Sequence, residues 1–241
     1  MPTLAAALIR KLTLTSRLDD DDIRAIENLR IHERQTGARQ TIVPDGSRPG
    51  DCCLVAEGFA VRSKTTSEGH RQILSIHLPG EIPDLQSLHL RVMDHDLMSL
   101  SPCTLGFMSH GDIRDVCRRR PNVADALWRE TLIDSAIFRE WIVNVGQRPA
   151  PARLAHILLE LHTRLKAIGK TRDGEFGLPI TQDELSDCLG ISAVHANRVL
   201  QELRKDGLIS VGRSEFHILD HQRLSELAGF DPLYLHLNPD L

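Results

Sequence analysis

The apolar residues of this chain recur with two different periods, and the change of period divides the sequence into regions. Leu4, Leu8 and Leu12 are spaced as on one face of a helix, which predicts a helix over residues 4–14. From residue 31 to about residue 105 the pattern changes to short apolar runs separated by turn signals such as Gly58 and Gly69. Short runs at near-regular spacing predict the β-strands of a sandwich or a barrel-like roll.

Helical spacing returns in the second half of the chain. A short helix is predicted over residues 111–120, and Pro121 suits the first position of a longer helix. We expect residues 146–151 to break that helix and to form a hinge before another helix over residues 153–168. Residues 169–177 form a predicted polar loop, and the C-terminal tail is apolar enough to pack back on the rest of the chain.

Two apolar rows run along the long helix that begins at Pro121. One row alternates steps of four and three residues, as in a coiled-coil seam: Ala124, Trp128, Thr131, Ser135, Phe138, Ile142 and Val145. The other row consists of Val123, Leu127, Ile133, Ile137 and Trp141. One row can cover the roll while the other meets an identical helix, so we predict a homodimer interface from Trp128 to Val145. The alternative is a single buried helix in a monomer.

A helix pair with a short turn is predicted near the C-terminus. Thr181 and Glu184 have the spacing of a capping box, in which each side chain accepts a hydrogen bond from the other residue's backbone. This first helix should end at Gly190, because glycine can adopt the left-handed conformation that a short turn requires. Ser192 is a suitable N-cap for a second helix over residues 192–206.

The second helix of the pair has two distinct faces. One arc is apolar and consists of Ala196, Val199, Leu200 and Leu203. The opposite arc consists of Val194, Arg198, Gln201 and Lys205, flanked by His195 and Asn197. The first arc can pack in a core, which leaves the second free to enter a DNA groove.

Two short apolar runs follow this helix, over residues 208–211 and 216–219, with a polar turn between them. They predict a β-hairpin. The order of these features is that expected of a winged helix-turn-helix that binds DNA: a capping box, a turn, a two-faced helix and a hairpin. The alternative is an ordinary amphipathic helix pair within some helical domain.

Length and charge limit the other functions. A chain of 241 residues suggests one to two domains, and we favour two. A formal net charge of −4 excludes a generally cationic coat protein, so affinity for DNA must come from a local face such as Arg198, Arg204, Lys205 and Arg213. No apolar run approaches the ~20 residues of a membrane span, and no signal-peptide pattern is present. We expect a cytoplasmic protein without membrane contact.

The cysteines and acidic clusters do not predict a metal centre. Five cysteines, an odd number, fit free thiols in a reducing compartment, and adjacent Cys52 and Cys53 should be one core residue and one exposed thiol. The carboxylates of residues 19–22 complement the positive end of a helix dipole. His89, Asp94, His95 and Asp96 are interpreted as solvated loop residues rather than metal ligands. We assign no cofactor and no metal.

Four segments carry a resemblance to a known family: GFAVRSKTTSEGHRQILSIHLPGEI, FREWIVNVGQR, RLAHILLEL and LPITQDELSDCLGISAVHANRVLQELRKDGLI. The whole chain resembles the Crp/Fnr superfamily of bacterial transcriptional regulators. The resemblance implies an α+β fold with a β-roll sensor domain of double-stranded jelly-roll type (1–120), a long dimerisation helix (121–147) and a winged helix-turn-helix DNA-binding domain (148–241). It also implies a homodimer that binds double-stranded DNA at palindromic promoter sites, with RNA polymerase and a small-molecule effector as further partners.

The resemblance gives roles to individual residues. Arg198 occupies the family's base-reading arginine position, where its guanidinium can pair with guanine O6 and N7. Val194 stands where many members have a glutamate that accepts from cytosine, so the family's commonest half-site is not expected here. The predicted DNA contacts are Thr181, Gln182, Ser192, Val194, His195, Asn197, Arg198 and Arg213.

The sensor half departs further from the family. Members that bind cyclic AMP carry an adjacent arginine and serine after the PGE turn, and the segment GEIPDLQSLHLRVMDHDLMSLS has no such pair, although Glu81 is present. The oxygen-sensing members hold an iron–sulfur centre with a cysteine cluster near the N-terminus, and this chain has no cysteine before Cys52. We therefore do not expect cyclic AMP as the signal, and the effector-binding residues stay unassigned.

No enzyme is predicted, because the sequence contains no nucleophile elbow, phosphate-binding glycine loop or pair of metal ligands at the usual spacing. The leading hypothesis is a DNA-binding transcription factor. The alternative is a small-ligand sensor that acts through protein contacts, with the winged helix as an interaction module.

Overall fold

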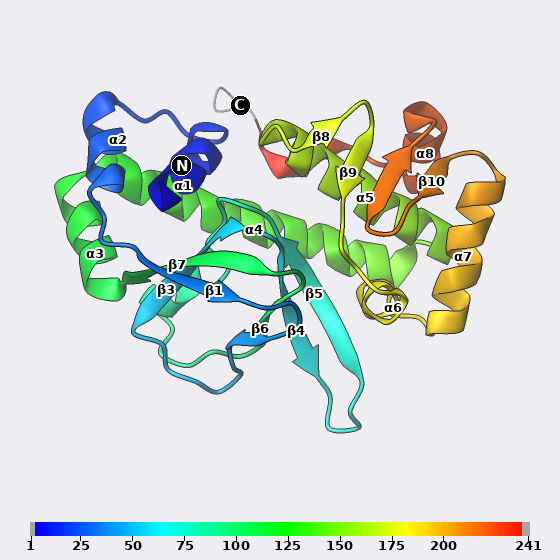
Figure 1. Cartoon of the computed structure of the whole chain (residues 1–241), viewed down its shortest axis with the longest axis horizontal. Coiled ribbons are helices and arrows are strands. Elements are labelled where there is room, and N and C mark those ends of the chain that lie inside the picture. Colours follow the sequence, from blue (N-terminus) through cyan, green and yellow to red (C-terminus); the bar gives the residue numbers. More distant parts are fainter. Residues whose placement is uncertain (1–2, 238–241) are drawn as a thin grey trace. The chain divides into compact units, whose positions relative to one another are not determined.

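The computed structural model describes residues 3–237 and divides into two compact units, whose elements are labelled in Figure 1. The first unit holds residues 3–64, 75–135, 236 and 237. The second holds residues 65–74 and 136–235. No helix among the residues described has the length and apolar content needed to cross a bilayer.

The elements of the first half alternate between short helices and a group of strands. In chain order they are α1 (Leu4–Thr13), α2 (Asp20–Glu27), β1 (His32–Thr36), β2 (Thr41–Val43), β3 (Asp51–Glu57), β4 (Ala60–Thr65), β5 (Arg71–His77), η1 (Leu85–Leu88), β6 (Asp96–Ser99), β7 (Cys103–Ser109) and α3 (His110–Arg119). The predicted turns at Gly58 and Gly69 are confirmed, since both residues have positive φ and lie between successive strands.

The strands form the predicted roll from two antiparallel sheets. One sheet has the order β1-β7-β3 and the other the order β2-β6-β4-β5. Gly58 is fixed by packing as well as by its φ of 87°, because a Cβ there would lie 2.4 Å from the carbonyl oxygen of Pro102.

The two faces of β3 are both covered, which corrects one prediction. Cys53 and Val55 pack inside the roll, whereas Cys52 and Leu54 pack against the helices outside it. Both adjacent thiols are therefore buried, and the prediction of one exposed cysteine is wrong. Alternation along a strand places two side chains on opposite faces, but it does not tell whether the second face meets water or helices.

The acidic run at residues 19–22 caps a helix, as predicted. The Asp19 carboxylate accepts a hydrogen bond from the backbone N–H of Asp22 at 2.8 Å, and the Asp22 carboxylate accepts one from the backbone N–H of Asp19 at 3.0 Å. Arg120 donates to both carboxylates, at 2.6 Å to Asp19 and 2.7 Å to Asp22. The run is thus held in a structural ion-pair network at the start of α2.

The second half of the chain is mainly helical. Its elements are α4 (Pro121–Gln147), α5 (Ala150–Ala167), β8 (Thr171–Arg172), β9 (Glu175–Gly177), α6 (Gln182–Leu189), α7 (Ala193–Lys205), β10 (Ile209–Val211), β11 (Glu215–Ile218), α8 (His221–Ala228) and η2 (Pro232–Leu235). Pro121 begins α4 as predicted. The break after α4 is narrower than predicted, because Gly146 is still helical and Pro151 already lies in the first turn of α5.

The residues expected to form a polar loop, 169–177, contain two short strands instead. β8 and β9 join the predicted hairpin in one sheet of order β10-β11-β9-β8. Phe176 faces Phe216 across the sheet, and their rings stack with centroids 6.0 Å apart. One buried aromatic residue therefore holds an otherwise polar segment in the sheet.

Candidate nucleic-acid interface

The first helix of the pair, α6, begins and ends as its sequence predicts. The Thr181 hydroxyl accepts from the N–H of Glu184 at 3.2 Å, and the Glu184 carboxylate accepts from the N–H of Thr181 at 2.7 Å. Gly190 ends the helix with a φ of 65°. Thr181 and Gln182 are exposed at this helix start, where free N–H groups and the helix dipole favour a phosphate.

The second helix, α7, buries one face and exposes the other. The Ser192 hydroxyl caps it by accepting from the N–H of His195 at 3.3 Å. Every residue of the predicted packing arc is buried: Ala196, Val199, Leu200 and Leu203. Every residue of the opposite arc is exposed: Val194, Arg198, Gln201 and Lys205. His195 and Asn197 are half-buried at the flanks, so the sequence predicted both faces correctly.

The buried face of α7 packs on a small core with α6 and α5. Leu185 and Leu189 of α6 are buried, while Ile191 in the turn is only half-buried. Each helix of the pair also buries a small side chain, Ser186 on α6 and Ala196 on α7. This core fixes the outer face of α7 on a rigid support rather than on a loop.

The predicted hairpin follows α7 and carries a cation at its turn. Gly212 closes the turn by donating to the carbonyl oxygen of Glu215 at 2.9 Å, and Arg213 is exposed between them. Within residues 3–237, neither Arg198 nor Arg213 makes a hydrogen bond or ion pair. Two guanidinium groups on this surface are therefore available to an external anion.

The two apolar rows of α4 differ in burial. Four residues of the seam row are exposed, Trp128, Thr131, Ser135 and Ile142, and Phe138 and Val145 are half-buried. The second row is buried throughout, from Val123 to Trp141. A single chain thus covers one row of α4 and leaves the other with large apolar side chains in water, including Trp128 at 67% and Ile142 at 66% exposure.

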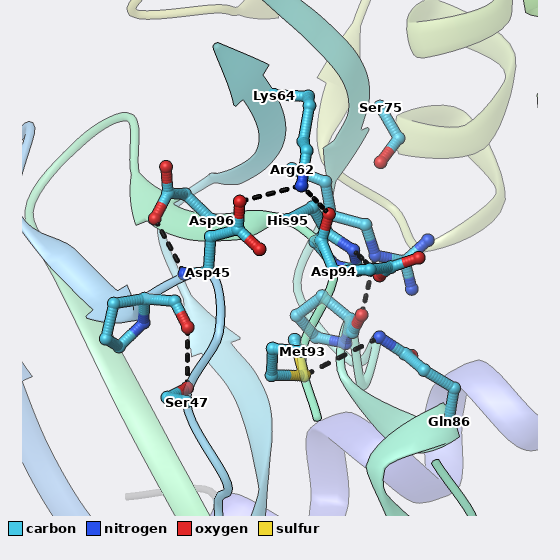
Figure 2. A network of polar contacts seen from close by, with 12 residues as sticks. Asp45, Ser47, Arg62, Lys64, Ser75, Gln86, Met93, Asp94, His95 and Asp96 are labelled. Atoms are coloured by element: carbon cyan, nitrogen blue, oxygen red, sulfur yellow. Dashed lines mark hydrogen bonds and ion pairs between the residues drawn. The ribbon is translucent and has the colours of Figure 1, made fainter. Parts of the chain in front are cut away.

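Charged side chains occupy the interior and edge of the roll, as Figure 2 shows. Arg62 is buried, donates from Nε to the carbonyl oxygen of Pro83 at 2.6 Å and pairs through Nη1 with Asp134 at 2.6 Å. Lys64 pairs with Asp45 at 2.7 Å. These basic groups of the roll are thus already engaged by carboxylates of the chain.

Burial lowers the pKa of two histidines of the roll, His77 and His95. His77 lies between Ser75 and Glu81, at 2.8 Å and 3.1 Å, and its burial lowers its pKa. The Nδ1 atom of His95 is hydrogen-bonded to the Asp94 carboxylate at 2.6 Å, and burial lowers the pKa of His95 as well. The interpretation of residues 94–96 as solvated loop is partly wrong, because His95 is buried and Asp96 begins β6. His89 is exposed. Among the described residues, no group of three or more His, Cys, Asp or Glu side chains could hold a metal ion.

A capped helix-turn-helix, an exposed cationic helix face and an adjoining β-wing define a DNA-binding protein of the winged helix type. Each half of the chain also matches the model of a known protein family. Residues 33–120 match the model of the cyclic nucleotide-binding domain, and residues 152–227 match the Crp-like helix-turn-helix domain. The chain belongs to the Crp/Fnr superfamily and is a DNA-binding transcriptional regulator.

Several known proteins are similar over nearly the whole chain. The transcriptional activator FnrL of Cereibacter sphaeroides is 26% identical over 231 residues, which cover 92% of this chain and 90% of that protein. The transcriptional activator anr of Pseudomonas aeruginosa is 23% identical over 218 residues, covering 90% and 89%. The structure of FixK2 from Bradyrhizobium japonicum superimposes with a TM-score of 0.75 at 22% identity, covering 83% of this chain and 98% of that chain.

Proposed function

We propose that the protein acts as a homodimer that reads a palindromic promoter site through α7, with the exposed row of α4 as the dimer interface. The observation that carries the proposal is the outer face of α7, where a polar and cationic surface is exposed beside a fully buried packing arc. Crp/Fnr regulators bind DNA and act as dimers. A two-fold protein presents two such helices to half-sites about one helical turn apart.

Each residue of the interface has a chemically defined partner on DNA. Arg198 pairs with guanine O6 and N7, and the exposed Val194 side chain contacts a thymine methyl group, since valine cannot accept a hydrogen bond from cytosine. His195 and Asn197 contact bases or phosphates from the flanks of the helix. Thr181, Gln182 and Ser192 at helix starts, and Arg213 on the wing, hold phosphates.

Regulation by cyclic AMP is not part of this proposal. The buried Arg62 guanidinium already pairs with Asp134, and the segment after the PGE turn lacks the adjacent arginine and serine that hold a cyclic phosphate in the family's cyclic-AMP-binding members. We propose another small-molecule effector acting at the first unit, and RNA polymerase as the further protein partner of the DNA-bound dimer.

The test is a mobility-shift assay on duplexes selected by the protein from a random pool. Arg198→Ala should weaken binding by about 1–3 kcal/mol, because it removes a bidentate base contact. Arg172→Ala removes the same charge from β8, at the edge of the wing sheet farthest from β10, and should weaken binding far less. Equal affinity of Arg198→Ala and the parent would refute the role of α7.

Salt dependence separates this function from a module that binds proteins. Phosphate contacts release counterions, so the logarithm of the DNA affinity should fall steeply and linearly with the logarithm of salt concentration. Arg213→Ala should make that slope shallower by about one unit and should weaken all sequences alike. A flat salt dependence would favour the interaction module instead.

A further inference from the structure

The first unit contains a cavity of about 460 Å³ outside the roll, between η1, α3 and the start of α4. Its floor is apolar and buried, and is formed by Leu85, Leu88, Ile113 and Leu127. Trp128 of α4 lines it as well and exposes 67% of its surface. The volume is within the range of about 300–1,000 Å³ that small-molecule sites occupy.

The polar groups that line this cavity are basic or neutral. Arg114, Arg118 and His89 contribute to the lining, which contains no aspartate or glutamate. Arg114 donates from Nη2 to the carbonyl oxygen of Leu88, which fixes the guanidinium beside η1 and leaves its other N–H groups for a ligand. Arg118 is more exposed and pairs with Asp115 at 2.8 Å, a residue that does not line the cavity.

We propose that this cavity binds a small amphipathic anion, with an apolar tail on the leucine floor and a carboxylate at Arg114. An apolar tail is stabilised in proportion to the apolar area that it removes from water. A guanidinium binds a carboxylate through two parallel hydrogen bonds, which selects an acid over the corresponding alcohol. The apolar floor and the cationic lining therefore select one chemical class of ligand.

The cavity meets the polar network of the roll at one labelled residue. Of the residues labelled in Figure 2, Gln86 alone lines it, and its amide contacts the sulfur of Met93 at 3.9 Å. Gln86 follows Leu85 in η1, so the network and the cavity share one short element.

Binding here would act on the dimer interface, and this consequence rests on the proposed function. Trp128 and Thr131 belong both to the cavity lining and to the exposed row of α4. Leu127, on the covered row, lines the same cavity. A bound tail touches both rows at one turn of the helix and so changes the surface that a second copy meets.

The experiment is a titration of the full-length protein with decanoate below its micelle concentration, followed by tryptophan fluorescence and calorimetry. Of the two tryptophans, Trp128 lines the cavity and Trp141 is 4% exposed, so a change in emission reports on Trp128. We expect saturable binding with a blue shift, and binding of decanol that is at least ten-fold weaker. Trp128→Phe should abolish the fluorescence change and keep the calorimetric signal.

Arg114→Gln should weaken decanoate binding at least ten-fold and leave decanol binding unchanged. Arg114→Lys keeps the charge but loses the planar guanidinium, so its affinity for decanoate should lie between those of the parent and of Arg114→Gln. It replaces Arg114→Gln in the test if that variant unfolds. Equal affinity for decanoate and decanol, or an Arg114→Lys protein that binds like the parent, would overturn the proposal.

A second copy is the other occupant that the titration can reveal. A dimer in sedimentation whose Trp128 emission is already blue-shifted and does not respond to decanoate would show that the partner fills the cavity, and the proposal would be wrong. The proposed DNA-binding function can fail without affecting this proposal, because Arg198→Ala should bind decanoate like the parent.

Discussion

Helices α5 and α7 belong to the same unit, but Glu160 on α5 and Arg198 on α7 lie in opposite environments. On α5, Glu160 is buried and its carboxylate accepts from the Trp141 indole at 3.1 Å, from the Tyr234 hydroxyl at 2.8 Å and from Arg164 at 2.9 Å. On α7, Arg198 is exposed and has no partner among the residues described. The Glu160 carboxylate on α5 thus has partners within the fold, whereas the Arg198 guanidinium on α7 faces solvent.

The difference shows how to separate structural from functional polar residues. Buried polar groups need partners within the fold, so their loss should lower the free energy of unfolding. An exposed polar group without a partner contributes little to folding, so its loss should change binding alone. Paired substitutions on the two helices can therefore test the assignment of α7 as the DNA-reading element.

The largest expected effect is on α5. Glu160→Ala should lower the free energy of unfolding by about 3–5 kcal/mol, because it removes the buried carboxylate to which Trp141, Tyr234 and Arg164 donate. Urea unfolding followed by circular dichroism measures it. Arg198→Ala is the matched control on α7 and should stay within about 0.5 kcal/mol of the parent. If Glu160→Ala lowered the free energy of unfolding by less than 1 kcal/mol, the distinction between the two helices would be wrong.

A pH dependence should follow from His156, which also lies on α5. Burial, and next the Arg148 guanidinium, lower its pKa to about 3. Glu140 at 3.4 Å and the Tyr234 hydroxyl at 3.4 Å also face its ring. Because the folded pKa lies below the unfolded value of about 6.5, the unfolded chain takes up a proton first as pH falls.

The contribution of neutral His156 to the free energy of unfolding is therefore complete above pH 6.5, and it is lost as the pH falls toward 3. We expect a loss of about 2 kcal/mol in the free energy of unfolding between pH 7 and pH 5. His156→Gln should remove this part of the pH dependence, which urea unfolding at several pH values can measure. An identical slope in the variant would contradict the assignment.

A change of similar size should appear in base preference on α7. Val194→Glu introduces an acceptor at an exposed position and should favour cytosine at one position of the half-site by about 1–3 kcal/mol. Selection from a random duplex pool, compared with the parent and with Val194→Ala, measures this shift. The same half-site for all three proteins would show that residue 194 does not contact a base.

The smallest effect should come from the cap of α7. Ser192→Ala removes the hydroxyl that accepts from the His195 N–H and should cost about 1 kcal/mol of unfolding free energy. Ser192→Asp, which restores an acceptor, should recover most of it. Thermal unfolding of the three proteins measures the difference. A Ser192→Ala protein as stable as the parent would mean that the cap contributes nothing.

The helix-turn-helix could be predicted because its signals are local. Thr181 and Glu184 are three residues apart, and Gly190 closes the turn between the two helices. The two faces of α7 follow from one helical period. Burial and exposure of its residues agree with that prediction, while their roles toward DNA stay proposals.

The features that sequence reasoning missed depend on distant parts of the chain. Glu160 meets Tyr234, which lies 74 residues away, so no local pattern marks either as a partner. Cys52 is buried because helices cover the outer face of β3. The cavity beside Trp128 exists only where η1, α3 and α4 meet.

The most direct test of α7 as the reading element is a double-mutant cycle between Arg198 and one guanine of the selected half-site. Replacing that guanine should cost the parent about 1–3 kcal/mol in binding and cost Arg198→Ala almost nothing, because the contact is already absent. Equal costs for both proteins would contradict base reading by Arg198.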